Sequence, residues 1–134
     1  MASTFTYTWN GPAITEGLRR AADRGVLRAA HLFRNEYLRL ILNTHKSGRV
    51  YGNHQASAPG QPPASDLGRL VQSCRVVHEP GSLVATVGVG TNYARMLELG
   101  TIHMSPRPAF LPAYTNVRPA MEAAITNEIA KEMA

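Results

Sequence analysis

The chain has 134 residues, with 14 Lys and Arg against 9 Asp and Glu, and a formal net charge of +5. This length is enough for one domain with a single modest core. The one cysteine, Cys74, excludes an internal disulfide, and we expect it to be a small buried residue. No apolar run reaches the roughly 18 residues that span a bilayer, and no secretory signal is visible. We therefore expect a soluble protein made in the cytoplasm, without membrane contact.

Residues 4–9 alternate threonine with Phe, Tyr and Trp, and residues 10–12 read Asn-Gly-Pro. An alternation of period two, built from strong strand formers, predicts a β-strand that ends at the Asn-Gly-Pro turn. Three aromatic side chains on one face indicate that this strand packs on something.

Residues 13–44 predict one long helix. Its apolar side would carry Ile14, Leu18, Ala22, Val26, Ala29, Leu32, Phe33 and Leu40, and its basic side Arg20, Arg24, Arg28 and Arg39. At 1.5 Å per residue the helix is about 45 Å long, so we expect part of it to pack on a neighbouring subunit. Gly25, in the middle, marks a bend or a close approach of another backbone.

The charge is concentrated in the first 50 residues, which hold eight Lys and Arg against three acids and so account for the whole net charge. A basic stripe attracts phosphate backbones or an acidic protein surface. A solvated helix face has the same composition, and the sequence leaves both readings open.

Residues 45–65 contain three glycines and three prolines and few large apolar residues. A loop of this length is unusual in a compact domain. Its proline content predicts an extended arm that docks on a partner.

Residues 75–77 and 83–89 predict two strands of a hairpin. Pro80-Gly81 between them suits the central positions of a type II turn, because glycine accepts a positive φ.

The next segment, residues 92–101, predicts a short helix. Asn92 would cap it, and Tyr93, Met96 and Leu97 would form its apolar face. Gly100 would end it in the left-handed conformation, in which a Cβ is penalised.

Prolines at positions 106, 108 and 112 stiffen the segment that follows, residues 107–113. Phe110 and Leu111 are its expected buried anchors. Glu98 is expected to bond to backbone N–H groups of the following loop or to Arg107, or to remain an exposed carboxylate. The last helix would begin at Pro112 or Pro119, with a break or kink near Arg118.

The sequence contains no recognisable catalytic constellation. The five histidines lie on different predicted elements without metal-ligand spacing, and no two carboxylates form an obvious acid–base pair. We expect neither an enzyme nor a bound metal or cofactor.

The expected fold class is α+β in one domain over residues 1–134. A long N-terminal helix and a C-terminal helix would pack on a small antiparallel sheet, with a long proline-rich loop.

Five motifs occur in the order typical of one family. They are Gly48-Arg49-Val50-Tyr51, Ser57 to Pro63, Asp66-Leu67-Gly68-Arg69-Leu70, Tyr93 to Thr101, and Arg107 to Ala113. In these motifs, across nearly its full length, the chain resembles the tail-completion (head–tail joining, or neck) proteins of long-tailed double-stranded DNA bacteriophages. Arg118-Pro119 departs from the family pattern, because the family's last helix usually runs on there.

The resemblance implies a structural virion protein that forms a ring, usually hexameric, at the junction between tail tube and head connector. It would complete the tail, allow head–tail joining and surround the DNA channel. The implied partners are further copies of the chain, neighbouring connector, tail terminator or tail tube proteins, and genomic DNA through the arginine face. The alternatives are a tail terminator or head-closure protein, or a small basic nucleic-acid-binding protein.

Two residue sets follow from these expectations. Contacts with a subunit or partner are expected at Ser57, Pro59, Gly60, Pro62, Pro63, Glu98 and Phe110. The structural signature comprises Tyr93, Leu97, Gly100, Thr101, Pro108 and Pro112.

Overall fold

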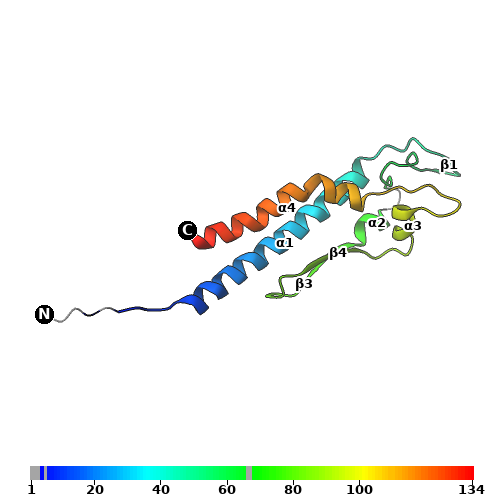
Figure 1. The fold of residues 1–134 in the computed structure, drawn as a ribbon. Helices are drawn as coiled ribbons and strands as arrows, with labels where there is room; N and C mark the ends of the chain where they lie inside the picture. The colour runs from blue at the N-terminus through cyan, green and yellow to red at the C-terminus, as the bar shows by residue number, and fades with distance from the viewer. Residues whose placement is uncertain (1–3, 5, 66–67) are drawn as a thin grey trace.

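The computed structural model describes residues 4, 6–65 and 68–134 (Figure 1). The expected α+β class is confirmed, with long N- and C-terminal helices and short antiparallel strands. The elements in order are α1 (Gly11–Asn43), β1 (Val50–Tyr51), β2 (His54–Gln55), α2 (Arg69–Gln72), β3 (Cys74–His78), β4 (Ala85–Val89), α3 (Ala94–Leu99) and α4 (Phe110–Met133).

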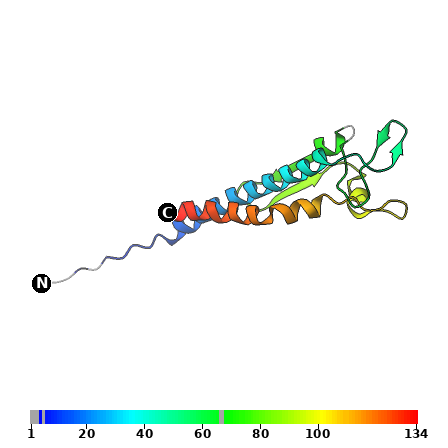
Figure 2. The same ribbon diagram turned by 90° about the horizontal axis from the view of Figure 1, so that it is seen from above.

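Helix α1 is the central element of the molecule. In Figure 1 it lies between α4 on one side and the β3–β4 hairpin on the other. Helices α1 and α4 run antiparallel, while β1, β2, α2 and α3 gather at the end of α1 that is remote from the N-terminus (Figures 1 and 2). The molecule is therefore a long helical pair with a cap of short elements at one end.

Small residues bring α1 and α4 together. Gly17, Ala21, Gly25 and Ala29 recur every four residues on one face of α1, and all four are buried. A Cβ at Gly25 would lie 2.7 Å from the Cα of Ile125. The close approach predicted for Gly25 is confirmed.

The apolar face predicted for α1 is only partly correct. Ala29 and Phe33 are buried, but Ile14 is 60 % exposed, and Tyr37 and Ile41, which the helical pattern left out, are buried. The reason is that the C-terminal half of α1 packs on the cap and on Phe110, whereas its N-terminal half contacts α4 through small residues and the hairpin turn through Asp23.

The core lies where α1 meets the cap. It comprises Phe33, Tyr37, Ile41, Leu70, Cys74, Ala109 and Ala113. The Phe110 ring packs on it, with its centroid 4.5 Å from that of Tyr37 and 5.4 Å from that of Phe33. Cys74 is buried as predicted, and this burial raises the pKa of its thiol.

The predicted hairpin and its turn are confirmed. Strands β3 and β4 are antiparallel, with Val76 opposite Val87. The Ser82 N–H donates to the Glu79 carbonyl across Pro80-Gly81, and Gly81 has φ +85°, as a type II turn requires.

The N-terminal strand prediction is wrong for the residues that can be judged. Residues 4 and 6–10 form no strand, and Tyr7 and Trp9 are 72 % and 71 % exposed; Phe5 lies outside the described residues. A strand needs a partner for its backbone groups, and Figures 1 and 2 show this segment leading away from the body.

Two helix starts also differ from prediction. Helix α3 begins at Ala94 with Tyr93 as N-cap, so Asn92 does not cap it. Helix α4 begins at Phe110 and runs through Pro119 to Met133. Of the predicted break or kink near Arg118, the break is therefore wrong, because the helix is continuous, whereas Figure 1 shows α4 bending in its orange part. Leu111 is 67 % exposed rather than an anchor, because in the first turn of α4 the inward positions are taken by Phe110 and Ala113.

Residues 45–65 fold back instead of extending as an arm. Strands β1 and β2 pair antiparallel, and the Gly48 N–H donates to the Ala56 carbonyl at 2.8 Å. Some backbone N–H and carbonyl groups of the loop therefore hydrogen-bond within the loop itself, and the chain returns towards the cap.

Candidate functional site

The candidate site is the corner at which α3, residues 100–109 and the first turn of α4 meet. Its central contact is the Glu98 carboxylate, which accepts backbone N–H groups from Ala109 at 2.8 Å, Phe110 at 3.1 Å and Leu111 at 3.1 Å. The first N–H groups of a helix have no partner within it, and a carboxylate there also complements the helix dipole. Of the roles considered for Glu98, bonding to backbone N–H groups is confirmed.

Gly100 shapes the turn between α3 and α4. It has φ 75° and ψ 176°, a region essentially restricted to glycine. A Cβ there would lie 2.8 Å from the Met104 carbonyl oxygen and 2.9 Å from the Pro106 nitrogen. The φ is positive as predicted, but ψ differs from that of the expected left-handed conformation. The close approach explains why a larger residue does not fit.

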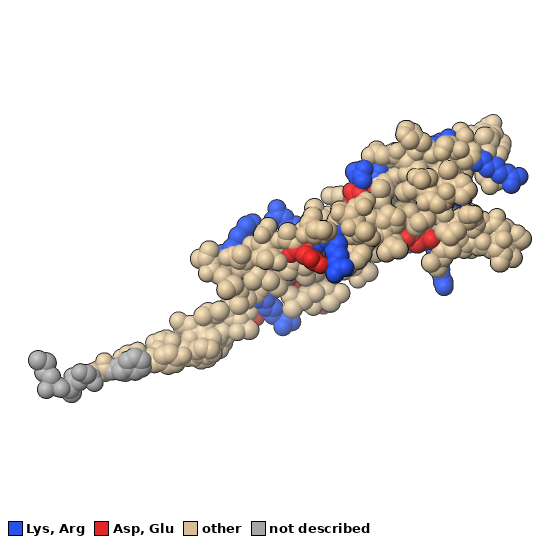
Figure 3. Space-filling model, turned by 45° about the horizontal axis from the view of Figure 1, so that its top comes forward, with Lys and Arg blue, Asp and Glu red and all other residues tan. Residues whose placement is uncertain are grey.

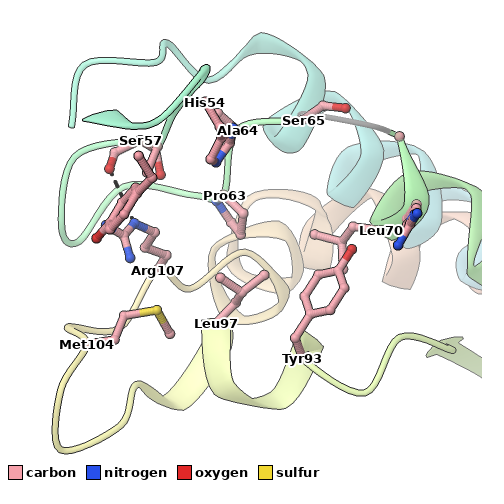
Figure 4. Close-up of a pocket in the computed structure, with 14 residues that line it drawn as sticks. His54, Ser57, Pro63, Ala64, Ser65, Leu70, Tyr93, Leu97, Met104 and Arg107 are labelled. Carbon is pink, nitrogen blue, oxygen red and sulfur yellow. Dashed lines mark hydrogen bonds between the residues drawn. The ribbon is translucent and has the colours of Figure 1, made fainter. Parts of the chain in front are cut away.

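Arg107 ties the proline-rich loop to this corner. It is 8 % exposed, its Nε donates to the Ser57 carbonyl at 3.3 Å (Figure 4), and its backbone N–H donates to the Leu97 carbonyl at 2.6 Å. The Gly60 N–H donates to the Pro106 carbonyl at 3.0 Å. Three segments that are far apart in sequence are therefore joined at one place.

A hollow of about 410 Å³ opens between these segments (Figure 4). Tyr93 just before α3, Leu97 of α3, Leu70 of α2, and Pro63 and Arg107 are among the residues that line it. Its wall is mostly apolar, and His54 and Ser57 are among its polar residues.

The structure distributes the expected partner-contact residues unevenly. Ser57 and Pro63 are buried within their own chain, Pro62 is half-buried, and Pro59 and Gly60 are exposed. Phe110, half-buried, packs on α1. Only the tip of the loop is therefore open to a partner.

The signature residues lie together at the corner. Leu97, Pro108 and Pro112 are half-buried, whereas Thr101 is exposed and Tyr93 is 37 % exposed. Thr101 pairs with Met104 in an isolated β-bridge, which closes the exposed turn around Ile102.

The arginine stripe is largely paired with acids. Arg28 contacts Glu128 of α4 at 2.8 Å, Arg24 contacts Glu128 at 3.4 Å and Glu132 at 3.5 Å, and Arg39 contacts Glu36 at 2.9 Å. On the face shown in Figure 3 the Lys and Arg side chains form separate groups rather than one continuous patch. Arg20 is exposed.

Glu128 of α4 lies in the contact with α1. Its side chain is 12 % exposed. Burial raises its pKa, but the charges and hydrogen bonds of Lys131, Arg28 and Arg24 outweigh burial, and the net pKa is lowered. The arginines of α1 therefore stabilise a charged residue in the α1–α4 contact.

A second polar cluster, which the sequence did not indicate, is centred on Asp23. The carboxylate of this residue, 8 % exposed, lies 3.0 Å from His78 Nε2 and accepts N–H groups from Gly81 and Leu83 at 2.9 Å. The Gly81 N–H and the His78 side chain, with Leu83, outweigh burial and lower the pKa of Asp23 to about 2. No local signal could reveal it, because its partners lie 55 to 60 residues away.

Among the described residues, no group of three or more His, Cys, Asp and Glu side chains is placed to hold a metal ion. In the same part of the chain, no helix is both long enough and apolar enough to cross a membrane.

Comparison of the chain with protein-family models, with curated proteins and with solved structures found no match.

Proposed function

We propose that this chain is a structural virion protein of the phage neck, which forms a ring at the tail–head junction, completes the tail and allows head–tail joining around the DNA channel. One observation carries the proposal beyond the sequence motifs. The Ser57–Pro63 loop, α3 with Gly100, and the Arg107–Ala113 segment meet in one corner through the Arg107–Ser57 and Glu98–helix contacts. Three of the five motifs of the resemblance thus lie together in one structural unit, which supports the proposal.

The same end of the molecule carries apolar side chains without a cover. Met96, Leu99, Ile102 and Leu111 are 54 %, 64 %, 94 % and 67 % exposed. Exposed apolar groups that cluster in this way are typical of protein-interaction surfaces. They support contact of the corner with another copy or with a connector, tail terminator or tail tube protein.

DNA contact has a smaller part in the proposal. Arg24, Arg28 and Arg39 pair with acids of their own chain, which reduces the net field available to phosphates. The proposed location is the virion neck, with assembly in the host cytoplasm.

Imaging of intact particles assembled with a tagged copy of the chain tests the proposal. We expect a ring of copies, most simply six, at the tail–head junction, and unjoined heads and tails when the gene is removed. A ring elsewhere in the neck would favour a tail terminator or head-closure role. A monomer that shifts DNA at physiological salt and is missing from particles would favour nucleic-acid binding and overturn the proposal.

A further inference from the structure

The N-terminal segment is composed of strand-forming residues, but no strand pairs with it in the described part of the chain. Thr6, Tyr7, Thr8 and Trp9 project from the body in all three whole-molecule views (Figures 1–3). Within the described part of the chain, no hydrogen bond joins these four residues to the body. The Tyr7 and Trp9 rings are more than two-thirds exposed, although burial of such rings is strongly favourable.

An apolar groove of about 390 Å³ runs along the body, between α4 and β4, with α1 as its floor. Its lining is entirely apolar except for the hydroxyl of Tyr114: Val26, Ala29, Ala30, Phe33, Ala85, Val87, Phe110, Tyr114, Met121 and Ile125. A volume of this size is within the range of natural binding pockets.

One wall of this groove is an open strand edge. Strand β4 pairs with β3 in a sheet of two strands only. Ala85 and Val87 of β4 line the groove, and no residue of β3 does. The edge that faces the groove is thus the one away from β3. An extended segment here would find backbone partners on one side and apolar pockets below it, the two requirements of strand addition.

The segment cannot reach the middle of its own groove. Ala29 lies 18 residues into α1, which is about 27 Å from Gly11 at 1.5 Å per residue. Tyr7 lies four residues before Gly11 and reaches at most about 14 Å in extended form, and Trp9 reaches less. A second copy of the chain has no such limit.

We infer that residues 6–9 of one copy add as a strand to the β4 edge of a second copy and place the Tyr7 and Trp9 side chains in its α1–α4–β4 groove, with Thr6 and Thr8 outward. The alternation explains the residue types, because a strand directs every second side chain to the same face. The inference requires self-association, which the proposed ring also requires, but not the phage assignment.

Trp9 is the only tryptophan, so its fluorescence reports directly on this segment. We expect its emission to shift to shorter wavelength, and acrylamide quenching to fall several-fold, as the full chain is concentrated and its mass rises in analytical ultracentrifugation. Tyr7→Ser should abolish both changes at the same concentration, whereas Thr8→Ser should preserve them.

The groove is tested by Tyr114→Glu, which places a charge on a 43 % exposed rim position. It should abolish the Trp9 changes, whereas Tyr51→Glu, at a 53 % exposed position outside this groove, should not. Should Tyr114→Glu impair folding, Tyr7→Ser remains decisive, because Tyr7 lies outside the body.

Two results would overturn the inference. One is self-association during which acrylamide quenches Trp9 as strongly as in the monomer. The other is a chain that stays monomeric, with unchanged Trp9 emission, at the highest concentration reached. Neither affects the neck proposal, which is judged by imaging of particles.

Discussion

At the scale of single residues, Glu98 is the side chain that holds the corner. One carboxylate satisfies three N–H groups at the start of α4. Removing a side chain that accepts from the first N–H groups of a helix costs about 0.5–2 kcal/mol of stability. The loss of a negative charge at a helix N-terminus costs about 0.3–1 kcal/mol.

We therefore expect Glu98→Ala to destabilise the protein by about 1–2 kcal/mol in urea unfolding, and Glu98→Gln by less, because an amide oxygen still accepts. Glu122→Ala is the matched control. It removes a carboxylate whose partner Arg118 is as exposed as Glu122 itself, so its effect should stay below about 0.5 kcal/mol. Equal losses for Glu98→Ala and Glu122→Ala would contradict the capping role.

Asp23 makes a pH-dependent contribution. Its folded pKa of about 2 lies below the ordinary aspartate value of 3.8, so the folded state favours the carboxylate. The resulting stability is fully present above about pH 4 and is lost as pH falls from about 4 towards 2. In this window the free energy of unfolding should fall more steeply for the parent than for Asp23→Asn.

Asp23→Asn should also be less stable at neutral pH, because an amide cannot accept from His78, Gly81 and Leu83 together. Chemical unfolding at a series of pH values gives both results. Parallel pH profiles for parent and variant would show that Asp23 does not hold the turn.

At the scale of elements, the contact between α1 and α4 depends on small residues. Alanine is favoured over glycine within a helix by about 1 kcal/mol. At Gly25, however, a Cβ meets the Ile125 backbone at 2.7 Å, and overpacking of this kind costs about 1–3 kcal/mol. Gly25→Ala should therefore lower the melting temperature.

Gly17→Ala is the control for that experiment. Its Cβ would meet Glu132 Oε1 at 2.8 Å, the end of a flexible side chain that can move away. We expect an unchanged or raised melting temperature, since the propensity gain remains. If both variants melt alike, the α1–α4 approach is less tight than described.

Ion pairs add to the same contact. Replacing Arg24 and Arg28 with glutamine leaves Glu128, at 12 % exposure, with Lys131 as its one remaining cation among the described pairs. We expect a loss of roughly 0.5–1 kcal/mol that shrinks at high salt, measured by thermal unfolding at two salt concentrations. Arg20→Gln should leave stability unchanged, and an equal loss there would contradict the pairing.

The sequence predicted elements where the signal was local. The hairpin with Pro80-Gly81 and the positive φ at Gly100 follow from turn chemistry that few residues decide. Prediction from the sequence was wrong or incomplete where contacts between residues far apart in the chain determine the structure. The Asp23 cluster joins positions 55 to 60 apart, and the fold-back of residues 45–65 depends on buried Arg107. Pro119 stays inside α4 because packing along α1 overrides its local preference.

At the scale of the whole molecule, charge and apolar surface are distributed differently from what composition indicated. Two of the basic residues in the first 50, Arg24 and Arg28, pair with Glu128 and Glu132 of α4, so part of this charge is neutralised in the folded chain. One group of uncovered apolar side chains, Met96, Leu99, Ile102 and Leu111, lies at the cap, near the turn that follows Gly100. Recognition by another protein is thus better supported than recognition of phosphates.

The sharpest test of that surface is Ile102, whose side chain is 94 % exposed. A side chain with so little cover in its own chain contributes little to folding, so Ile102→Asp should leave the melting temperature within about 1–2 °C of the parent. If the corner contacts a subunit or a neck protein, a charge there loses apolar burial and is desolvated without a partner. Ring formation and head–tail joining should then fall at least tenfold in a complementation assay.

Val77→Asp, at a 67 % exposed position on β3 away from the corner, controls for a general effect of added charge. Normal joining by Ile102→Asp, or equal loss by Val77→Asp, would remove the corner from the proposed interface.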